Sequence, residues 1–180
     1  KEVQKVLFNR FEKKEEFTLS TKTANFNDAP LENGGEMYHK VTGDFVVMAT
    51  VADMEGLKSR NVTGFNEGGI LIENNGTFYQ LGAFPLYNCG NMLTVLSRRG
   101  RPQYPNYKGY NYDPFIQFER RGNQLFARSS KDGKTWNNMP GSPIQVNATT
   151  LNIGAYQTTY SENSSWVKLK DYIIYEKSEK

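Results

Sequence analysis

The stretch FIQFERRGNQLFARSSKDGKTW, residues 115–136, decides the fold of this chain. Apolar and polar residues alternate on both sides of a turn at 121–123. Alternation with a period of two around a Gly-Asn turn predicts a β-hairpin. One face of the hairpin is apolar and must pack on another sheet. The opposite face carries Gln117, Glu119 and Arg128, which can meet water or a ligand.

Length and composition narrow the class of protein. The chain has 180 residues, 13% aromatic residues and 16 glycines, which favours one β-domain spanning 1–180. A single cysteine excludes an internal disulfide. The net charge of +3 comes from interspersed charges, without the basic patch of a nucleic-acid-binding protein. No apolar run is long enough to span a membrane.

The rest of the chain reads as strands joined by turns, about ten to twelve in all. We predict strands, besides the hairpin, at 5–11, 17–20, 37–41, 44–53, 68–73, 77–84, 92–98, 151–158 and 166–175. Asn74-Asn75-Gly76 is a hairpin turn, and 100–113 is a long tyrosine-rich loop. No segment has the pattern of a helix.

The order of several stretches resembles the concanavalin A-like lectin/glucanase superfamily. The resemblance is nearest to families related to the C-terminal domain of β-xylosidases and to the yeast "regulation of enolase" protein. It rests on Thr42-Gly43-Asp44-Phe45, Gly68 to Ile72, Phe118 to Asn123, Ser130 to Trp136, Asn152 to Ala155 and Leu169 to Ile174. It implies an all-β jelly-roll sandwich of two curved antiparallel sheets, whose concave face or rim often binds carbohydrate.

Two positions depart from that family pattern. Glu73 stands where many relatives have a basic residue, and Gln80 stands where they often have a lysine. The catalytic Glu-x-Asp-x-Glu strand of the glucanase branch is also absent. This absence argues against a retaining hydrolase of that kind, which needs two carboxyl groups about 5 Å apart.

Polar residues of several predicted strands form the candidate site. We expect them to converge on one sheet face; they are Glu73, Gln80, Arg98, Gln117 and Glu119. In one hypothesis this face binds a ligand. In the alternative, Glu73 and Glu119 form a carboxylate pair for general acid-base hydrolysis. A third interpretation is that these charges are simply solvated.

Aromatic residues are the second set of candidates. The tyrosine-rich loop contains Tyr104, Tyr107, Tyr110 and Tyr112. Their rings can stack on sugars while the hydroxyl groups form hydrogen bonds, or they can hold a long loop on the sheet. Trp166, at the start of the last strand, has the same two interpretations.

Other conspicuous residues are predicted to be structural. Asp132 and Trp136 lie in a Ser-x-Asp-Gly-x-Thr-Trp stretch similar to the Asp-box turns of sialidases, in which the aspartate binds backbone N–H groups. With one histidine and one cysteine, a conventional zinc site is excluded. We expect no cofactor. Structural calcium held by loop oxygens stays open, although no EF-hand spacing supports it.

These observations predict a non-catalytic, lectin-like carbohydrate-binding domain. We expect it to belong to an exported protein, periplasmic, cell-surface or secreted, whose signal segment is not in this sequence. The alternatives are a glycoside hydrolase and a purely structural or protein-interaction domain. The sequence does not predict the sugar or the oligomeric state.

Overall fold

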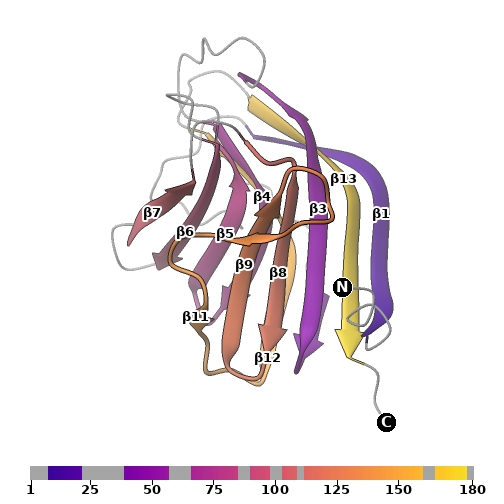
Figure 1. Cartoon of the computed structure of the whole chain (residues 1–180), viewed down its shortest axis with the longest axis vertical. Helices are drawn as coiled ribbons and strands as arrows, with labels where there is room; N and C mark the ends of the chain where they lie inside the picture. Colours follow the sequence, from indigo (N-terminus) through magenta and orange to yellow (C-terminus); the bar gives the residue numbers. More distant parts are fainter. Residues whose placement is uncertain are drawn as a thin grey trace.

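The computed structural model describes residues 8–21, 39–56, 66–84, 90–97, 103–108, 112–159 and 165–177. Two antiparallel sheets lie face to face (Figure 1). Within these ranges every regular element is a strand. The predicted jelly-roll β-sandwich is therefore confirmed. No helix in this part of the chain has the length and apolar character needed to cross a membrane.

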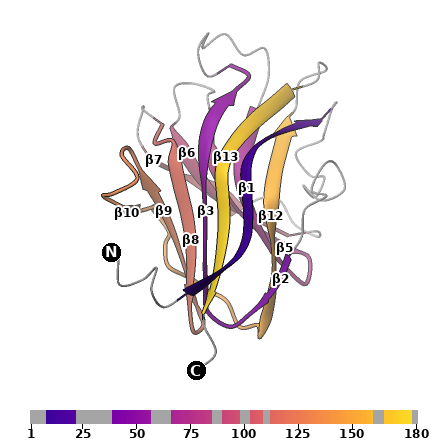
Figure 2. The ribbon, with the colours of Figure 1, turned by 90° about the vertical axis from the view of Figure 1, so that its right-hand side faces the viewer.

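The first sheet has seven strands, and most of them run along the near side of the molecule in Figure 1. Its order is β1 (Phe8–Thr21), β13 (Ser165–Lys177), β3 (Phe45–Met54), β8 (Phe115–Arg121), β9 (Gln124–Ser130) and β10 (Asn137–Asn138), with β11 (Ile144–Gln145) also paired to β9. Figure 2 shows β13 between β3 and β1, so the two ends of the described chain pair in one sheet.

The second sheet has six strands. Its order is β2 (His39–Thr42), β12 (Thr150–Thr159), β4 (Asn66–Asn74), β5 (Thr77–Ala83), β6 (Asn91–Ser97) and β7 (Gln103–Lys108). Neighbouring strands pair antiparallel throughout.

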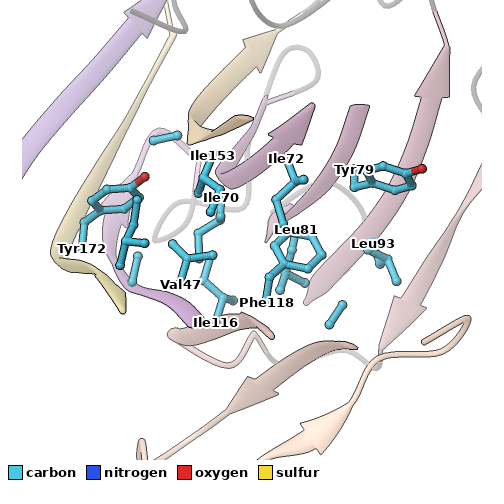
Figure 3. Packing of buried hydrophobic residues seen from close by; sticks show 14 of the residues in the cluster. Val47, Ile70, Ile72, Tyr79, Leu81, Leu93, Ile116, Phe118, Ile153 and Tyr172 are labelled. Carbon is cyan, nitrogen blue, oxygen red and sulfur yellow. The ribbon is translucent and has the colours of Figure 1, made fainter. Parts of the chain in front are cut away.

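The main core fills the space between the two sheets, as Figure 3 shows. Each strand contributes every second residue, as the pleat of a β-strand requires. The labelled side chains are Val47, Ile116, Phe118 and Tyr172 from the seven-stranded sheet and Ile70, Ile72, Tyr79, Leu81, Leu93 and Ile153 from the six-stranded sheet. Burial between the sheets thereby fixes which residues face outward.

Both tight turns predicted from sequence are present. Asn75 has φ of 48° and Gly76 has φ of 82°, the positive values that a two-residue hairpin turn demands. Gly122 has φ of 57° between β8 and β9. The register of the second hairpin pairs Gln117 with Arg128 and Glu119 with Phe126.

Buried amides join the two sheets at their ends. The Asn66 Nδ2 of β4 donates to the carbonyl oxygens of Glu55 and Trp166, both at 3.1 Å. The Gln157 Nε2 donates to Asn66 Oδ1 at 2.8 Å. Since Trp166 belongs to β13, one asparagine connects strands of both sheets.

A second polar link joins β6 to the segment before β8. The Asn91 Nδ2 donates to the Asp113 carbonyl oxygen at 2.9 Å, and the Asp113 N–H donates to Asn91 Oδ1 at 2.7 Å. The Ser129 hydroxyl donates to Asp113 Oδ2 at 2.8 Å. All three residues are buried. Their hydrogen bonds satisfy polar groups that would otherwise destabilise the core.

A β-bulge interrupts β13. Lys170 pairs with Thr50 and Ile173 pairs with Met48, so two residues of β13 oppose one residue of β3. The first of them, Asp171, has φ of 50°. The core side chains of β13 therefore change from odd-numbered positions before the bulge to even-numbered positions after it.

Two predicted boundaries were wrong. The separate strands expected at 5–11 and 17–20 are one strand over the described part, β1. The predicted loop at 100–113 contains β7. Its Pro105 argued against a strand, but β7 is at the edge of its sheet, where a missing N–H is tolerated.

Candidate functional site

The predicted carboxylate pair does not exist in this fold. Glu73 follows Ile72 in β4, and Glu119 follows Phe118 in β8. Ile72 and Phe118 both point into the core between the sheets. Because side chains alternate along a strand, the two glutamates point out of opposite sides of the sandwich. Packed sheets are about 10 Å apart, so the glutamates cannot reach the roughly 5 to 9.5 Å spacing of glycosidase carboxyl groups.

The expected common polar face is wrong for the same reason. Gln80 lies with Glu73 on the outer side of the six-stranded sheet, whereas Gln117 lies with Glu119 on the outer side of the seven-stranded sheet. Arg98 lies outside the described residues.

The outer side of the six-stranded sheet is not the hydrophilic surface that the sequence suggested. Leu71, Phe78 and Tyr156 form a second apolar cluster there, and each is fully buried. Gln80 and Thr94, register partners on β5 and β6, are 3% and 4% exposed. Apolar side chains thus fill much of this face.

A buried carboxyl group lies on the same side. Tyr156 donates a hydrogen bond to Glu67 Oε1. Burial raises the pKa of Glu67 from 4.5 to about 8, although the hydrogen bond from Tyr156 opposes the shift. Burial, and then the charge of Glu67, raise the pKa of Tyr156 well above its usual value. At neutral pH the pair is therefore uncharged.

Glu73 has a structural role at the hairpin between β4 and β5. Its Oε1 accepts the Gly76 N–H at 2.9 Å, and its Oε2 accepts a hydrogen bond from Asn152 Nδ2 on the neighbouring strand. These contacts hold the Asn75-Gly76 turn on the sheet and leave Glu73 occupied by its own fold.

The tyrosines are only partly within the described chain. The Tyr112 hydroxyl donates to the Val51 carbonyl oxygen at 3.3 Å, and its ring packs against the core, so Tyr112 holds the chain on the sheet. Burial, and then the charge of Asp53, raise the pKa of Tyr112. Tyr104 and Tyr107 lie on β7, where only the backbone is described. Tyr110 lies outside the described residues.

Trp166 is half-buried at the start of β13, and its carbonyl oxygen accepts the Asn66 and Glu55 hydrogen bonds. The structural prediction for Asp132 is confirmed. Its Oδ1 accepts the N–H groups of Lys134 and Thr135, each at 2.8 Å. These backbone hydrogen bonds lower the pKa of Asp132.

The described residues with the most accessible polar chemistry lie on the outer side of β8 and β9. We call this set the hairpin face; it comprises Gln117, Glu119, Arg121, Phe126 and Arg128. They share one side because alternate residues of each strand point the same way and Glu119 pairs with Phe126.

Glu119 is the centre of the hairpin face. It is 1% exposed, and its Oε1 accepts hydrogen bonds from Arg121 Nε at 2.9 Å and Arg128 Nη1 at 3.0 Å. Arg128 Nη1 also donates to Gln117 Oε1 at 3.2 Å, and Arg128 Nε donates to Asn138 Oδ1 at 3.2 Å. The carboxylate therefore holds both guanidinium groups in fixed positions.

Phe126 lies between the two arginines. The guanidinium carbon is 5.6 Å from the ring centroid for Arg121 and 4.9 Å for Arg128, within the range of cation–π attraction. The Arg121 side chain is 56% exposed and that of Arg128 is 16% exposed. The hairpin face therefore presents two ordered cations and one aromatic ring to solvent.

This arrangement suits binding better than covalent chemistry. It contains one carboxylate, and that carboxylate is occupied by two arginines. Within the described ranges, no group of three or more histidine, cysteine, aspartate and glutamate side chains could hold a metal ion. The structural calcium considered from sequence remains a prediction.

The sequence analysis placed Gln117, Glu119 and Arg128 together but missed Arg121 and Phe126. Arg121 was assigned to the turn, and Phe126 was counted only as part of the alternation. The signal was the hairpin register, because residues 117, 119 and 121 face the same way as 124, 126 and 128. Glu67 was missed because it was assigned to a polar loop, whereas it lies in β4.

No protein-family model matches the chain, and no curated protein matches its sequence. A functionally unknown protein from Saccharomyces cerevisiae has a TM-score of 0.66 at 14% identity, covering 92% of this chain and 90% of that chain. The GH43 protein BlXynB from Bacillus licheniformis has a TM-score of 0.57 at 14% identity, covering 91% of this chain and 33% of that chain. This chain thus spans about a third of that protein. The Bacillus licheniformis β-glucanase has a TM-score of 0.51 at 10% identity, with 91% and 79% covered. At these identities the chain shares their β-sandwich fold.

Proposed function

We propose that the protein binds carbohydrate at the hairpin face and does not cleave it. The observation that carries this proposal is the Arg121 guanidinium, which is 56% exposed and held by Glu119 and Phe126. Sugar hydroxyl groups need such directional donors, and an adjacent aromatic ring offers an apolar surface for sugar C–H groups.

The structural relatives support a glycan-related role without specifying it. The Bacillus licheniformis β-glucanase and the GH43 protein share the sandwich. Because fold alone does not determine activity, the proposal depends on the side chains of the hairpin face. We propose further that the protein is exported, so that it can meet extracellular polysaccharide.

The absence of cleavage follows from the placement of carboxyl groups. Glu67 and Glu73 share the outer side of β4 but are six residues apart, or about 20 Å along an extended strand. Glu119 is on the opposite side of the sandwich and is 1% exposed. These glutamates lack the spacing of a glycosidase pair.

Calorimetric titration with a panel of soluble plant and bacterial polysaccharides tests the proposal. We expect the wild type to bind at least one polysaccharide, and Arg121→Ala to weaken that binding about tenfold, as the loss of a charge-assisted hydrogen bond does. Lys134→Ala is the matched control, because Lys134 is an exposed cation outside the hairpin face.

Two results would overturn the proposal. One is the absence of binding to every polysaccharide in the panel; the other is equal binding by wild type and Arg121→Ala. Reducing-end release should not exceed that of a buffer blank. Release that Glu119→Gln abolishes would replace the binding proposal with a hydrolase.

A further inference from the structure

We propose that the hairpin face selects anionic carbohydrate, with the carboxylate of a uronic acid residue bound by Arg121 and Arg128. This inference rests on the proposed function of the same face and adds the charge class of its ligand. It is carried by the charge balance, the remaining donors, the rigidity of the guanidinium groups and the pairing of the strand edges.

The charge balance of the hairpin face is positive. Two guanidinium groups contact a single carboxylate, that of Glu119. Arg121 is the more accessible of the two cations, at 56% exposed, whereas the carboxylate is 1% exposed. An approaching ligand therefore meets positive charge first, and the chain as a whole is also positive at +3.

Both arginines retain donors that point to no acceptor in the described part of the chain. Arg121 uses Nε for Glu119, and no hydrogen bond is formed there by its Nη1 and Nη2. Arg128 uses Nε and Nη1 and keeps Nη2. The terminal edge of a guanidinium offers two parallel N–H groups that match the two oxygens of a carboxylate. A neutral sugar leaves that charge complementarity unused.

The guanidinium groups are ordered before a ligand arrives. Glu119 fixes one edge of each, and the Phe126 ring lies 5.6 and 4.9 Å from their carbon atoms. Long, freely rotating side chains lose entropy when they bind a ligand, and this loss is smaller for groups already held in place. The hairpin face is therefore prepared for an anion.

The pairing of the strands favours a polysaccharide over an acidic peptide. An extended peptide commonly binds a sheet by adding a strand to an unpaired edge. Here β8 pairs with β3 and β9, and β9 pairs with β10 and β11. Backbone groups are already paired, so a ligand is recognised by side chains alone, as the ring carboxylates of a uronate polymer are.

The test compares polygalacturonate with its fully methyl-esterified form of matched length, by calorimetry in low and moderate salt. We expect the wild type to bind polygalacturonate about tenfold more tightly than the ester. Arg121→Gln should remove most of that preference. Lys134→Gln, which deletes an exposed charge elsewhere, should keep it. A thermal melt of each variant confirms folding.

The possible failures are distinguishable. If both polymers bind equally and Arg121→Gln weakens both, carbohydrate binding stands and selection of anions is overturned. If neither polymer nor any other polysaccharide binds, both proposals fail. Equal losses in Arg121→Gln and Lys134→Gln would indicate diffuse charge and overturn the inference. Polyglutamate binding as tightly as polygalacturonate, with the same dependence on Arg121, would overturn the carbohydrate class.

Discussion

The hydroxyl group of Tyr156 on β12 donates a hydrogen bond to the carboxyl group of Glu67 on β4, and both side chains are buried. The pair lies on the outer side of the six-stranded sheet, next to the apolar Leu71 and Phe78. A carboxyl group in this position is held neutral, and its ionisation is coupled to folding.

The first prediction concerns the pH dependence of stability. The pKa of Glu67 is raised to about 8 in the folded protein, whereas it is near 4.5 when the chain is unfolded. The folded state therefore retains a proton that the unfolded state loses, and stability contributed by this group falls as pH rises between these values. We expect Glu67→Gln to be the more stable protein at pH 8 by a few kcal/mol, on the order of one pKa unit's worth or more.

Urea unfolding of wild type and Glu67→Gln from pH 4 to pH 9 measures this difference. Below the unfolded pKa both proteins carry a neutral side chain, so their free energies of unfolding should approach each other. Parallel curves across the whole range would contradict the assignment. All other titrating groups are common to the two proteins and cancel.

The second prediction concerns the close approach of β4 and β5 beneath Tyr156. A Cβ added at Gly82 would lie 2.1 Å from the Gly68 carbonyl oxygen and 2.8 Å from the Tyr156 hydroxyl oxygen. We expect Gly82→Ala to destabilise the protein by about 1–3 kcal/mol or more, as overpacking of a core does. Chemical denaturation gives the value.

Gly43→Ala is the control for this substitution. Gly43 has φ of 79°, and an added Cβ there would meet nothing within 4 Å. Its cost should be limited to the backbone strain of about 1 kcal/mol. Equal costs at the two glycines would mean that steric contact does not decide the choice of glycine at position 82.

The third prediction concerns the link between the sheets at Asn91. Asn91→Ala removes both partners of the Asp113 backbone, whose N–H and carbonyl groups are bonded to it at 2.7 and 2.9 Å. We expect a loss of about 2 kcal/mol or more, because buried polar groups are left without partners. Asn147→Ala, at an exposed position, should change stability by less than about 0.5 kcal/mol. A similar loss in both variants would argue against the link.

The fourth prediction concerns the turn at Asp132. Protonation or replacement of its carboxylate removes the acceptor of the Lys134 and Thr135 N–H groups. Because the folded pKa is lowered, the contribution of this carboxylate is present above the unfolded pKa and is lost as pH falls through the folded value. In Asp132→Ala we expect faster hydrogen exchange at Lys134 and Thr135 than in wild type. Unchanged exchange would show that the carboxylate does not hold the turn.

Local chemistry made much of the fold predictable. The Asn75-Gly76 and Gly122 turns follow from residues that adopt positive φ, and the alternation around them gave the strands. The edge strand β7 was missed because Pro105 and the glycines nearby are typical of a loop. Whether a proline lies at an edge depends on sheet order, which local sequence does not contain.

The site was only partly predictable for a related reason. Alternation assigns Glu73 and Glu119 to outward-facing positions, and both predictions of orientation are correct. Alternation does not say which sheet a strand joins, so the two outer sides were merged into one face. Phe126 and Arg121 required the register of β8 with β9, which a hairpin turn supplies when each residue is followed through it.

The bulge at Asp171 gives the last strand two phases. Before it, odd-numbered residues such as Leu169 enter the core; after it, even-numbered residues such as Tyr172 and Ile174 do. Deleting this one residue would act like a frameshift in three dimensions, rotating two large apolar side chains into solvent and Ile173 into the interior. The length of β13 is thus constrained as tightly as its composition, and an alignment that slides a gap along this strand exchanges inside for outside.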